Sequence, residues 1–181
     1  MTRKIIERQS EFPYHIYNRV LSQKHYPPAL QKLIWSIYCE ELRVVSWAFG
    51  FRIHLFLMMS NHYHMVVETP DANISEGMLY FQREVSKRIK DLTRSQDYRF
   101  QTRYKWKAIQ NMIQYENTYR YIAHNPRKAG LCTDPLDYTY CTLHGQFGGG
   151  VLECPIYEWS RFSALLPVCM NERAEWIRCQ V

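Results

Sequence analysis

The sequence predicts an α+β fold of the ferredoxin-like (RRM-like) kind, in which helices cover one face of an antiparallel sheet. The prediction comes from the order of its segments, β-α-β-β-α-β with one further helix after them. Composition agrees with a globular domain, because 46% of the 181 residues are hydrophobic and only 22% are charged. Such a chain contains enough apolar side chains to bury a core.

Each element is predicted from residue type and spacing. Aromatic and β-branched residues indicate strands, and apolar residues recurring every three or four positions indicate helices. Proline fits the first turn of a helix, and a helix tends to end at the residue before a later proline. In chain order we expect a strand over 14–20, a helix from Pro27-Pro28 to about Arg43, a strand over 44–57, a turn at Ser60-Asn61, a strand over 62–68, a helix over 74–92, a strand over 103–109 and a helix over 111–124 that ends at Asn125-Pro126.

Three consecutive glycines, Gly148 to Gly150, are interpreted as a flexible joint. They divide the chain into a main domain, residues 1–147, and a tail, residues 148–181. Within the tail, short helices are expected over 159–166 and 172–179, packed on the main domain.

The charge of the chain favours an anionic partner. Lys and Arg outnumber Asp and Glu by 23 to 17, for a net charge of +6, which suits nucleic acid first. The six cysteines show no CxxC pair, so a zinc ribbon is not expected. The first residues lack the apolar core of a secretory signal, and the longest apolar stretch is interrupted by Arg52 and His54. We therefore expect a cytoplasmic protein with free thiols and no membrane span.

The sequence Asn61-His62-Tyr63-His64 is the strongest local feature. A strand points residues i and i+2 to the same face, so His62 and His64 should stand side by side, where two imidazoles can bind one metal ion. The alternative is a pair of sheet histidines with no ligand, or one core histidine and one spectator.

A second pair of candidates lies on the helix predicted over residues 111–124. Tyr121 and Asn125 are four residues apart, so the phenol and the amide should lie on one helix face. The amide is a candidate metal ligand, and the phenol could attack an electrophile that the metal polarises. Tyr115 and Tyr119 have no such partner four residues on. The alternative is that Tyr121 packs in the core and Asn125 caps the helix.

Five segments together resemble the IS200-like and REP-associated tyrosine transposases, the single-tyrosine transposases with an HUH motif. They appear in family order between Tyr14 and His144, and they are YHIYNRV, NHYHMVVETP, RYKWKAI, YRYIAHNPRKAGLC and DPLDYTYCTL. The resemblance departs at two points. Arg127 follows the Asn-Pro where the family commonly has valine, and Met59-Ser60 stands where Met-Pro is usual.

This resemblance implies a function. It makes Tyr121 the nucleophile, His62 and His64 metal ligands, and Asn125 the third ligand. It implies a metal-assisted single-stranded DNA endonuclease and strand transferase with a 5′-phosphotyrosine intermediate, acting on hairpin-forming repeats. The implied metal is Mg²⁺ or Mn²⁺, whereas imidazole ligands alone would favour zinc. Related proteins occur as monomers and as homodimers.

The expected DNA contacts are basic and aromatic residues of the second long helix and of the strand after it. Basic side chains neutralise phosphates and aromatic rings stack on bases. The set is Arg83, Lys87, Arg88, Arg103, Tyr104, Lys105, Trp106 and Lys107. For the helix charges, a solvated face is an equal alternative.

Two other functions compete with this one. A non-catalytic nucleic-acid-binding module could use the same sheet, although only a fragment of an RRM motif occurs, at residues 47–51. A metal-dependent hydrolase could use water in place of Tyr121.

Overall fold

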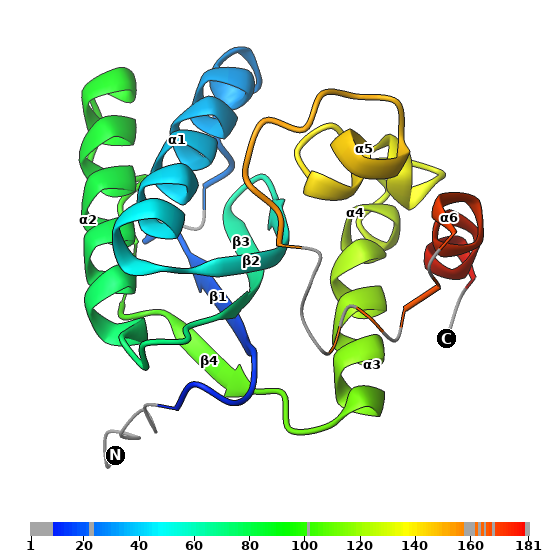
Figure 1. Ribbon diagram of the computed structural model, residues 1–181. Coiled ribbons are helices and arrows are strands. Elements are labelled where there is room, and N and C mark those ends of the chain that lie inside the picture. Colours follow the sequence, from blue (N-terminus) through cyan, green and yellow to red (C-terminus); the bar gives the residue numbers. More distant parts are fainter. Residues whose placement is uncertain are drawn as a thin grey trace.

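The computed structural model describes residues 9–21, 24–100, 102–157, 162, 164, 166, 167 and 169–179. Its main elements confirm the predicted order of strands and helices (Figure 1). They are β1 (Tyr14–Arg19), α1 (Gln31–Phe49), β2 (Arg52–Met58), β3 (His62–Glu68), α2 (Ile74–Thr93), β4 (Lys105–Ala108), α3 (Met112–Ala123), α4 (Asn125–Lys128), α5 (Thr142–Phe147) and α6 (Met170–Arg178). Two short 3-10 helices, η1 (Pro28–Leu30) and η2 (Pro135–Asp137), complete the set among the described residues.

The four strands form one antiparallel sheet in the order β2-β3-β1-β4. The two strands that are adjacent in sequence, β2 and β3, form a hairpin, while β1 lies between β3 and β4. This order is that of the split βαβ, ferredoxin-like motif. Tyr17 lies opposite His64 across the β1–β3 pair, and Lys105 lies opposite Tyr17 across the β1–β4 pair.

Helices cover the two faces of the sheet unequally. Figure 1 shows α1 and α2 side by side on one face, where Ile16, Tyr63 and Met65 join the larger buried cluster. On the other face, Leu55 and Leu57 of β2 pack with α3 and the C-terminal part of the chain. On this second face, α3 and the C-terminal part of the chain therefore cover β2.

The expected strand over residues 44–57 is wrong in its first half. Residues 44–49 continue α1, because Tyr38, Leu42 and Val45 keep the helical spacing and are all buried. The helix ends where Gly50 adopts a left-handed conformation with φ of 66°, which favours glycine. The strand begins only at Arg52, so the apolar run is the end of α1, in which Val45 is buried and Trp47 is exposed, followed by a buried strand.

The helix expected to end at Asn125-Pro126 continues after a short break. α3 ends at Ala123, and Pro126 occupies the first turn of the four-residue helix α4. The amide of Lys128 donates to the carbonyl of His124 at 2.9 Å, so the backbone resumes a helical path. Proline lacks only an N–H that a first turn does not use, so it starts this turn.

The glycine run is closely packed at two of its three positions. A Cβ on Gly148 would lie 2.0 Å from the carbonyl oxygen of Leu136, and one on Gly150 would lie 2.4 Å from the ring of His144. Close approach therefore explains these two glycines, in contrast to the expected flexible joint. The division at residue 148 stays a prediction.

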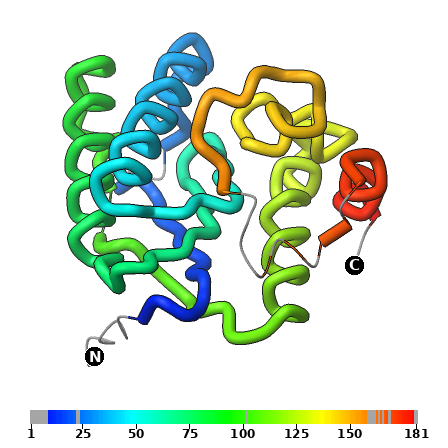
Figure 2. Tube along the Cα trace, viewed as in Figure 1, coloured from blue at the N-terminus to red at the C-terminus, as the bar shows by residue number. Residues whose placement is uncertain are grey.

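After the glycines the chain returns to the sheet, as the tube in Figure 2 shows. The amide of Tyr157 donates to the carbonyl of Ile53 at 2.7 Å, and Cys154 is buried in the cluster beneath α1. The helix expected over 172–179 is observed as α6. The helix expected over 159–166 falls largely outside the described residues.

Gly77 offers a test of the packing of α2 on the end of α1. A Cβ at this position would lie 2.3 Å from the buried ring of Phe51. We expect Gly77→Ala to lower the free energy of unfolding by about 1 to 3 kcal/mol through overpacking, measured by urea unfolding. Lys87→Ala, at an exposed position of the same helix, is the control and should change it by less than about 0.5 kcal/mol. An unchanged or increased stability for Gly77→Ala would contradict this packing.

Candidate functional site

His62 and His64 line a cavity of about 480 Å³ on the sheet face opposite α1 and α2. The alternation of β3 places Tyr63 in the core and the two histidines together on the other face, with ring centroids 5.2 Å apart. We call this space the histidine cavity, and its lining residues are Tyr17, Asn18, Arg19, His62, His64, Thr102, Lys105, Tyr121 and Asn125.

Hydrogen bonds orient both imidazoles. The Nδ1 of His62 lies 2.8 Å from Oδ1 of Asn61, and because that oxygen only accepts, Nδ1 donates and the neutral ring keeps its lone pair on Nε2. The Nδ1 of His64 lies 3.0 Å from Nε2 of His15. If His64 donates in that bond, its Nε2 is likewise left with the lone pair that a metal ion requires.

His15 is a site residue that our sequence analysis missed. It lies on β1, and its ring stacks on that of His64 with centroids 5.2 Å apart. The strand YHIYNRV contained the signal, because His15, Tyr17 and Arg19 alternate with the core residues Tyr14 and Ile16. Only the pairing of β1 with β3 shows which histidine they face.

Burial keeps these three histidines neutral. Desolvation, aided by the charge of Lys107, lowers the pKa of His15 to about 4. Desolvation, aided by Arg19 and His25, lowers the pKa of His62 to about 4. For His64, desolvation and the neighbouring His15, His62 and Arg19 lower the pKa to about 3. Neutral imidazole is the form that ligates metals, so the cavity offers unprotonated nitrogen at neutral pH.

Tyr121 is the tyrosine of α3 that reaches the histidine cavity. Its side chain is 47% exposed, whereas Tyr115 and Tyr119 are 1% and 3% exposed and belong to the buried cluster that α3 forms with β2 and the C-terminal part of the chain. The ring of Tyr121 stands edge-on to His64 and His15, at 5.8 and 6.2 Å between centroids. The ammonium of Lys128 lies 5.8 Å from the centre of the Tyr121 ring, which adds positive charge beside the phenol.

Asn125 also lines the cavity, one turn beyond Tyr121 at the start of α4. Its Nδ2 is buried, and no group among the described residues hydrogen-bonds to it. The amide is therefore not fixed by a protein partner at that nitrogen. This fits a side chain that would complete its contacts with a bound ligand.

Four of the predicted DNA contacts stand at the sheet edge or on an exposed helix surface. Lys105 and Lys107 alternate on the edge strand β4 and lie on the same face as His15 and Tyr17. Lys105 lines the histidine cavity, with its ammonium 5.7 Å from the centre of the Tyr17 ring. Lys87 is exposed on α2, and Arg83 is exposed on the same helix, ion-paired to Glu84 at 2.8 Å.

Three others make contacts within the protein that the sequence did not indicate, and their role as DNA contacts stays a prediction. Arg88 is ion-paired to Glu40 at 2.5 Å and to the buried Glu41 at 2.8 Å, so it joins α2 to α1. Tyr104 is buried, and Trp106 packs edge-on against Tyr14 on the face away from Lys105. Strand alternation explains the position of Trp106, because Lys105 and Lys107 on either side of it point to the opposite face of the sheet.

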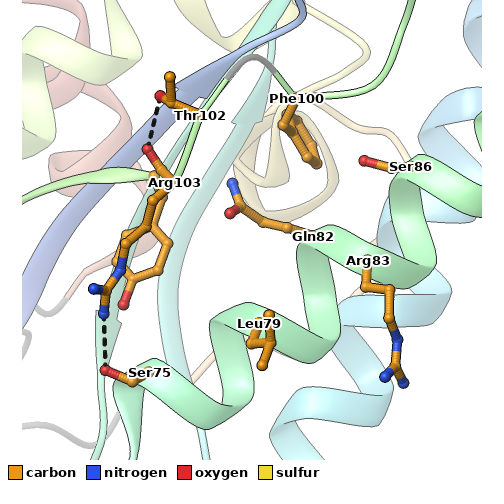
Figure 3. A pocket seen from close by; sticks show the side chains of 9 residues that line it. Ser75, Leu79, Gln82, Arg83, Ser86, Phe100, Thr102 and Arg103 are labelled. Carbon is orange, nitrogen blue, oxygen red and sulfur yellow. Dashed lines mark hydrogen bonds between the residues drawn. The ribbon is translucent and has the colours of Figure 1, made fainter. Parts of the chain in front are cut away.

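Arg103, the remaining predicted contact, lines a separate groove between α2 and the segment before β4 (Figure 3). Its guanidinium donates to Oγ of Ser75 at 3.1 Å and lies over the ring of Tyr104.

The described part of the chain contains no group of three His, Cys, Asp or Glu side chains arranged to bind a metal ion. Any metal in the histidine cavity would therefore need ligands besides the histidines, such as an amide, water or phosphate. No helix in that part of the chain is both long and apolar enough to cross a membrane.

Comparison with known proteins identifies a family and a solved structure of similar fold. A family model described as "Transposase IS200 like" matches residues 10–125. The fold is similar to the solved "Structure of the REP associates tyrosine transposase bound to a REP hairpin", with a TM-score of 0.66 and 19% sequence identity over 90% of this chain and 93% of that chain. At this identity the second match concerns the fold alone. No curated protein sequence matches the chain.

The lowered histidine pKa values give a prediction about stability without added metal. An unfolded histidine takes up a proton below about pH 6.5, whereas in the folded protein these three remain neutral down to about pH 4 or lower. Because the unfolded state binds more protons in this window, the free energy of unfolding should rise with pH from about 4 to 6.5. Urea unfolding at intervals of pH measures this.

The matched control replaces the three rings together by neutral amides, His15→Gln, His62→Gln and His64→Gln. This variant should show a shallower rise over the same window. An equally steep rise would mean that other groups cause the pH dependence.

Proposed function

This chain belongs to the IS200-like transposase family, and from that premise we propose that it is a single-stranded DNA endonuclease and strand transferase with Tyr121 as its nucleophile. One observation carries the proposal. A half-exposed tyrosine stands against a pair of neutral histidines in an open cavity, while the two other tyrosines of its helix are buried.

We propose that Mg²⁺ or Mn²⁺ binds in the histidine cavity. The Nε2 atoms of His62 and His64 and the amide oxygen of Asn125 would hold it, with water and a phosphate oxygen completing the coordination. The residues fit such an ion, because Asn61 and His15 engage the Nδ1 atoms and Asn125 lines the same cavity as the two histidines. When bound, the ion would offset the negative charge of the phosphodiester and stabilise its transition state.

In the proposed cleavage, the hydroxyl oxygen of Tyr121 replaces the 3′ oxygen of the DNA on phosphorus. The Tyr121 Oη–P bond forms while the P–O3′ bond breaks, which leaves a 5′-phosphotyrosine and a free 3′-hydroxyl. The phenol loses its proton as it attacks, and the departing 3′ oxygen takes one up. A 3′-hydroxyl attacking the phosphotyrosine reverses these bond changes and joins DNA strands, so transfer needs no external energy source.

We propose single-stranded or hairpin DNA as the substrate. The solved relative was bound to a REP hairpin, and hairpin-forming repeats are the corresponding proposal for this chain. The charges agree with it, because Arg19 and Lys105 line the histidine cavity and Lys107 is next along the same face of β4. We propose that the protein acts on this DNA as a monomer or as a homodimer.

A non-catalytic binding module is the second candidate. It is favoured by the exposed Tyr17 beside Lys105 on an open sheet face, a surface on which a base can stack. A module that only binds nucleic acid would not require a tyrosine such as Tyr121 beside the histidine pair. The presence or absence of a covalent protein–DNA product separates the two.

Replacing Tyr121 tests the proposed nucleophile. Tyr121→Phe removes one hydroxyl from a half-exposed ring, so it should abolish cleavage and leave DNA binding nearly intact. Wild-type protein incubated with Mn²⁺ and labelled single-stranded DNA that carries a hairpin-forming repeat should give a covalent band on a denaturing gel, and the variant should give none. Tyr119→Phe is the matched control and should keep the band, because Tyr119 is buried on the far side of α3. Cleavage without any covalent species would instead indicate hydrolysis by water.

Replacing the histidines tests the proposed metal site. Mn²⁺ binding, followed by electron paramagnetic resonance of the free ion, should be lost in His64→Ala. His15→Phe keeps an aromatic ring but removes the partner of the His64 Nδ1, so it should weaken binding about 10- to 100-fold.

Tyr17→Phe is the control for these variants. Tyr17 is next to His15 on the same face of β1, and its ring stacks on that of His64. We assign it no role as a metal ligand, so Mn²⁺ binding should be unchanged in this variant. If His64→Ala bound Mn²⁺ as tightly as wild type, the ion would have to lie elsewhere.

A further inference from the structure

A groove of about 520 Å³ lies between α2 and the segment that leads into β4. We call it the α2–β4 groove. Figure 3 shows Leu79 and Gln82 of α2 on one side and Arg103 on the other, with Phe100 at one end. The volume is in the range of sites that accept a small organic group such as a nucleotide.

The α2–β4 groove adjoins the histidine cavity. Thr102 lines both spaces, with the cavity residue Lys105 after it and the groove residues Arg103 and Tyr104 between. Asn18 of β1 fixes this junction by donating from Nδ2 to the carbonyl oxygen of Thr102 at 2.8 Å. Because β4 is an edge strand, a chain leaving the histidine cavity can pass over Thr102 into the groove without crossing the sheet.

The lining of the groove is apolar with a cationic rim. Leu79 is 69% exposed, although it is a large apolar residue, and the partly buried Phe100 adds a second apolar surface. Arg83 and Arg103 are its charged lining residues, and no Asp or Glu is among the residues that line it. In Figure 3 the guanidinium of Arg83 is turned away from the groove, so Arg103 is the cation nearest to an occupant.

We propose that the α2–β4 groove binds an unpaired nucleotide of the DNA strand next to the scissile phosphate, with its base on Leu79 and Phe100 and its phosphate on Arg103. This inference rests on the proposed function. An unpaired base exposes its ring face to an apolar wall, whereas a base within a stem exposes only its edges. Gln82 lines the groove and donates from Nε2 to the hydroxyl of Tyr63 at 3.1 Å, which leaves its Oε1 to accept a hydrogen bond from the edge of such a base.

Binding measured in the Tyr121→Phe background tests the groove without cleavage. The probes are a fluorescein-labelled random-sequence single-stranded 30-mer and a blunt hairpin without single-stranded tails, followed by fluorescence anisotropy. Leu79→Glu places a carboxylate in the groove and should weaken binding of the 30-mer about 10-fold. Arg103→Gln should weaken it and also reduce the slope of log K against log salt by about 0.7, the loss of one phosphate contact on a single strand.

Val151→Glu is the matched control. Val151 is apolar and 82% exposed, and its carbonyl oxygen lies beside Gly145 of α5, a helix that Figure 1 shows apart from α2. It should bind both probes like the parent protein. Thermal unfolding of each variant checks that the fold is kept.

The outcomes separate the two proposals. If the parent protein binds neither probe, the proposed function fails. If the parent binds the 30-mer and both groove variants match Val151→Glu, the groove inference alone is wrong. If the variants weaken only the hairpin, a stem occupies the groove, and the unpaired nucleotide is again excluded.

Discussion

The antiparallel register between β1 and β3 is the constraint on which the rest of the site depends. It sets Tyr17 opposite His64 and, through the pleat, gathers His15, Arg19 and His62 on the same face. The same register directs Ile16 and Met65 into the core beneath α1 and α2. A slip of one residue would bury the polar set and expose the apolar one, so the burial of the core and the assembly of the site are a single requirement.

The surroundings of the histidines serve two purposes. Burial and the nearby Arg19 and Lys107 lower the pKa values of the imidazoles and so keep them neutral. The same positive charges favour the approach of a phosphodiester. The histidines are oriented by Asn61 and His15, which do not line the cavity. The site is therefore built from more residues than those that would touch a substrate.

The C-terminal part of the chain supports the helix that carries Tyr121. The guanidinium of Arg120 lies 4.3 Å from the centre of the Trp176 ring, and the Nε2 of His124 lies 2.8 Å from the carbonyl oxygen of Ile177. Both contacts join α3 or its end to α6, which lies beyond the part of the chain that matches the family model. These contacts hold α3 in place from the side opposite the histidine cavity.

The sequence by itself determined the order of strands and helices, the pairing of His62 with His64 on one face, and the spacing of Tyr121 from Asn125. These follow from periodicity, which is a local property of the chain. Tertiary structure alone decided the rest. The run 44–57 was ambiguous because the end of a helix and a buried strand can both be rich in apolar residues. The role of Arg88 depended on Glu41, 47 residues away. His15 joined the site, and Trp106 lies on the face away from Lys105, because strand pairing decides which residues from distant segments share a face.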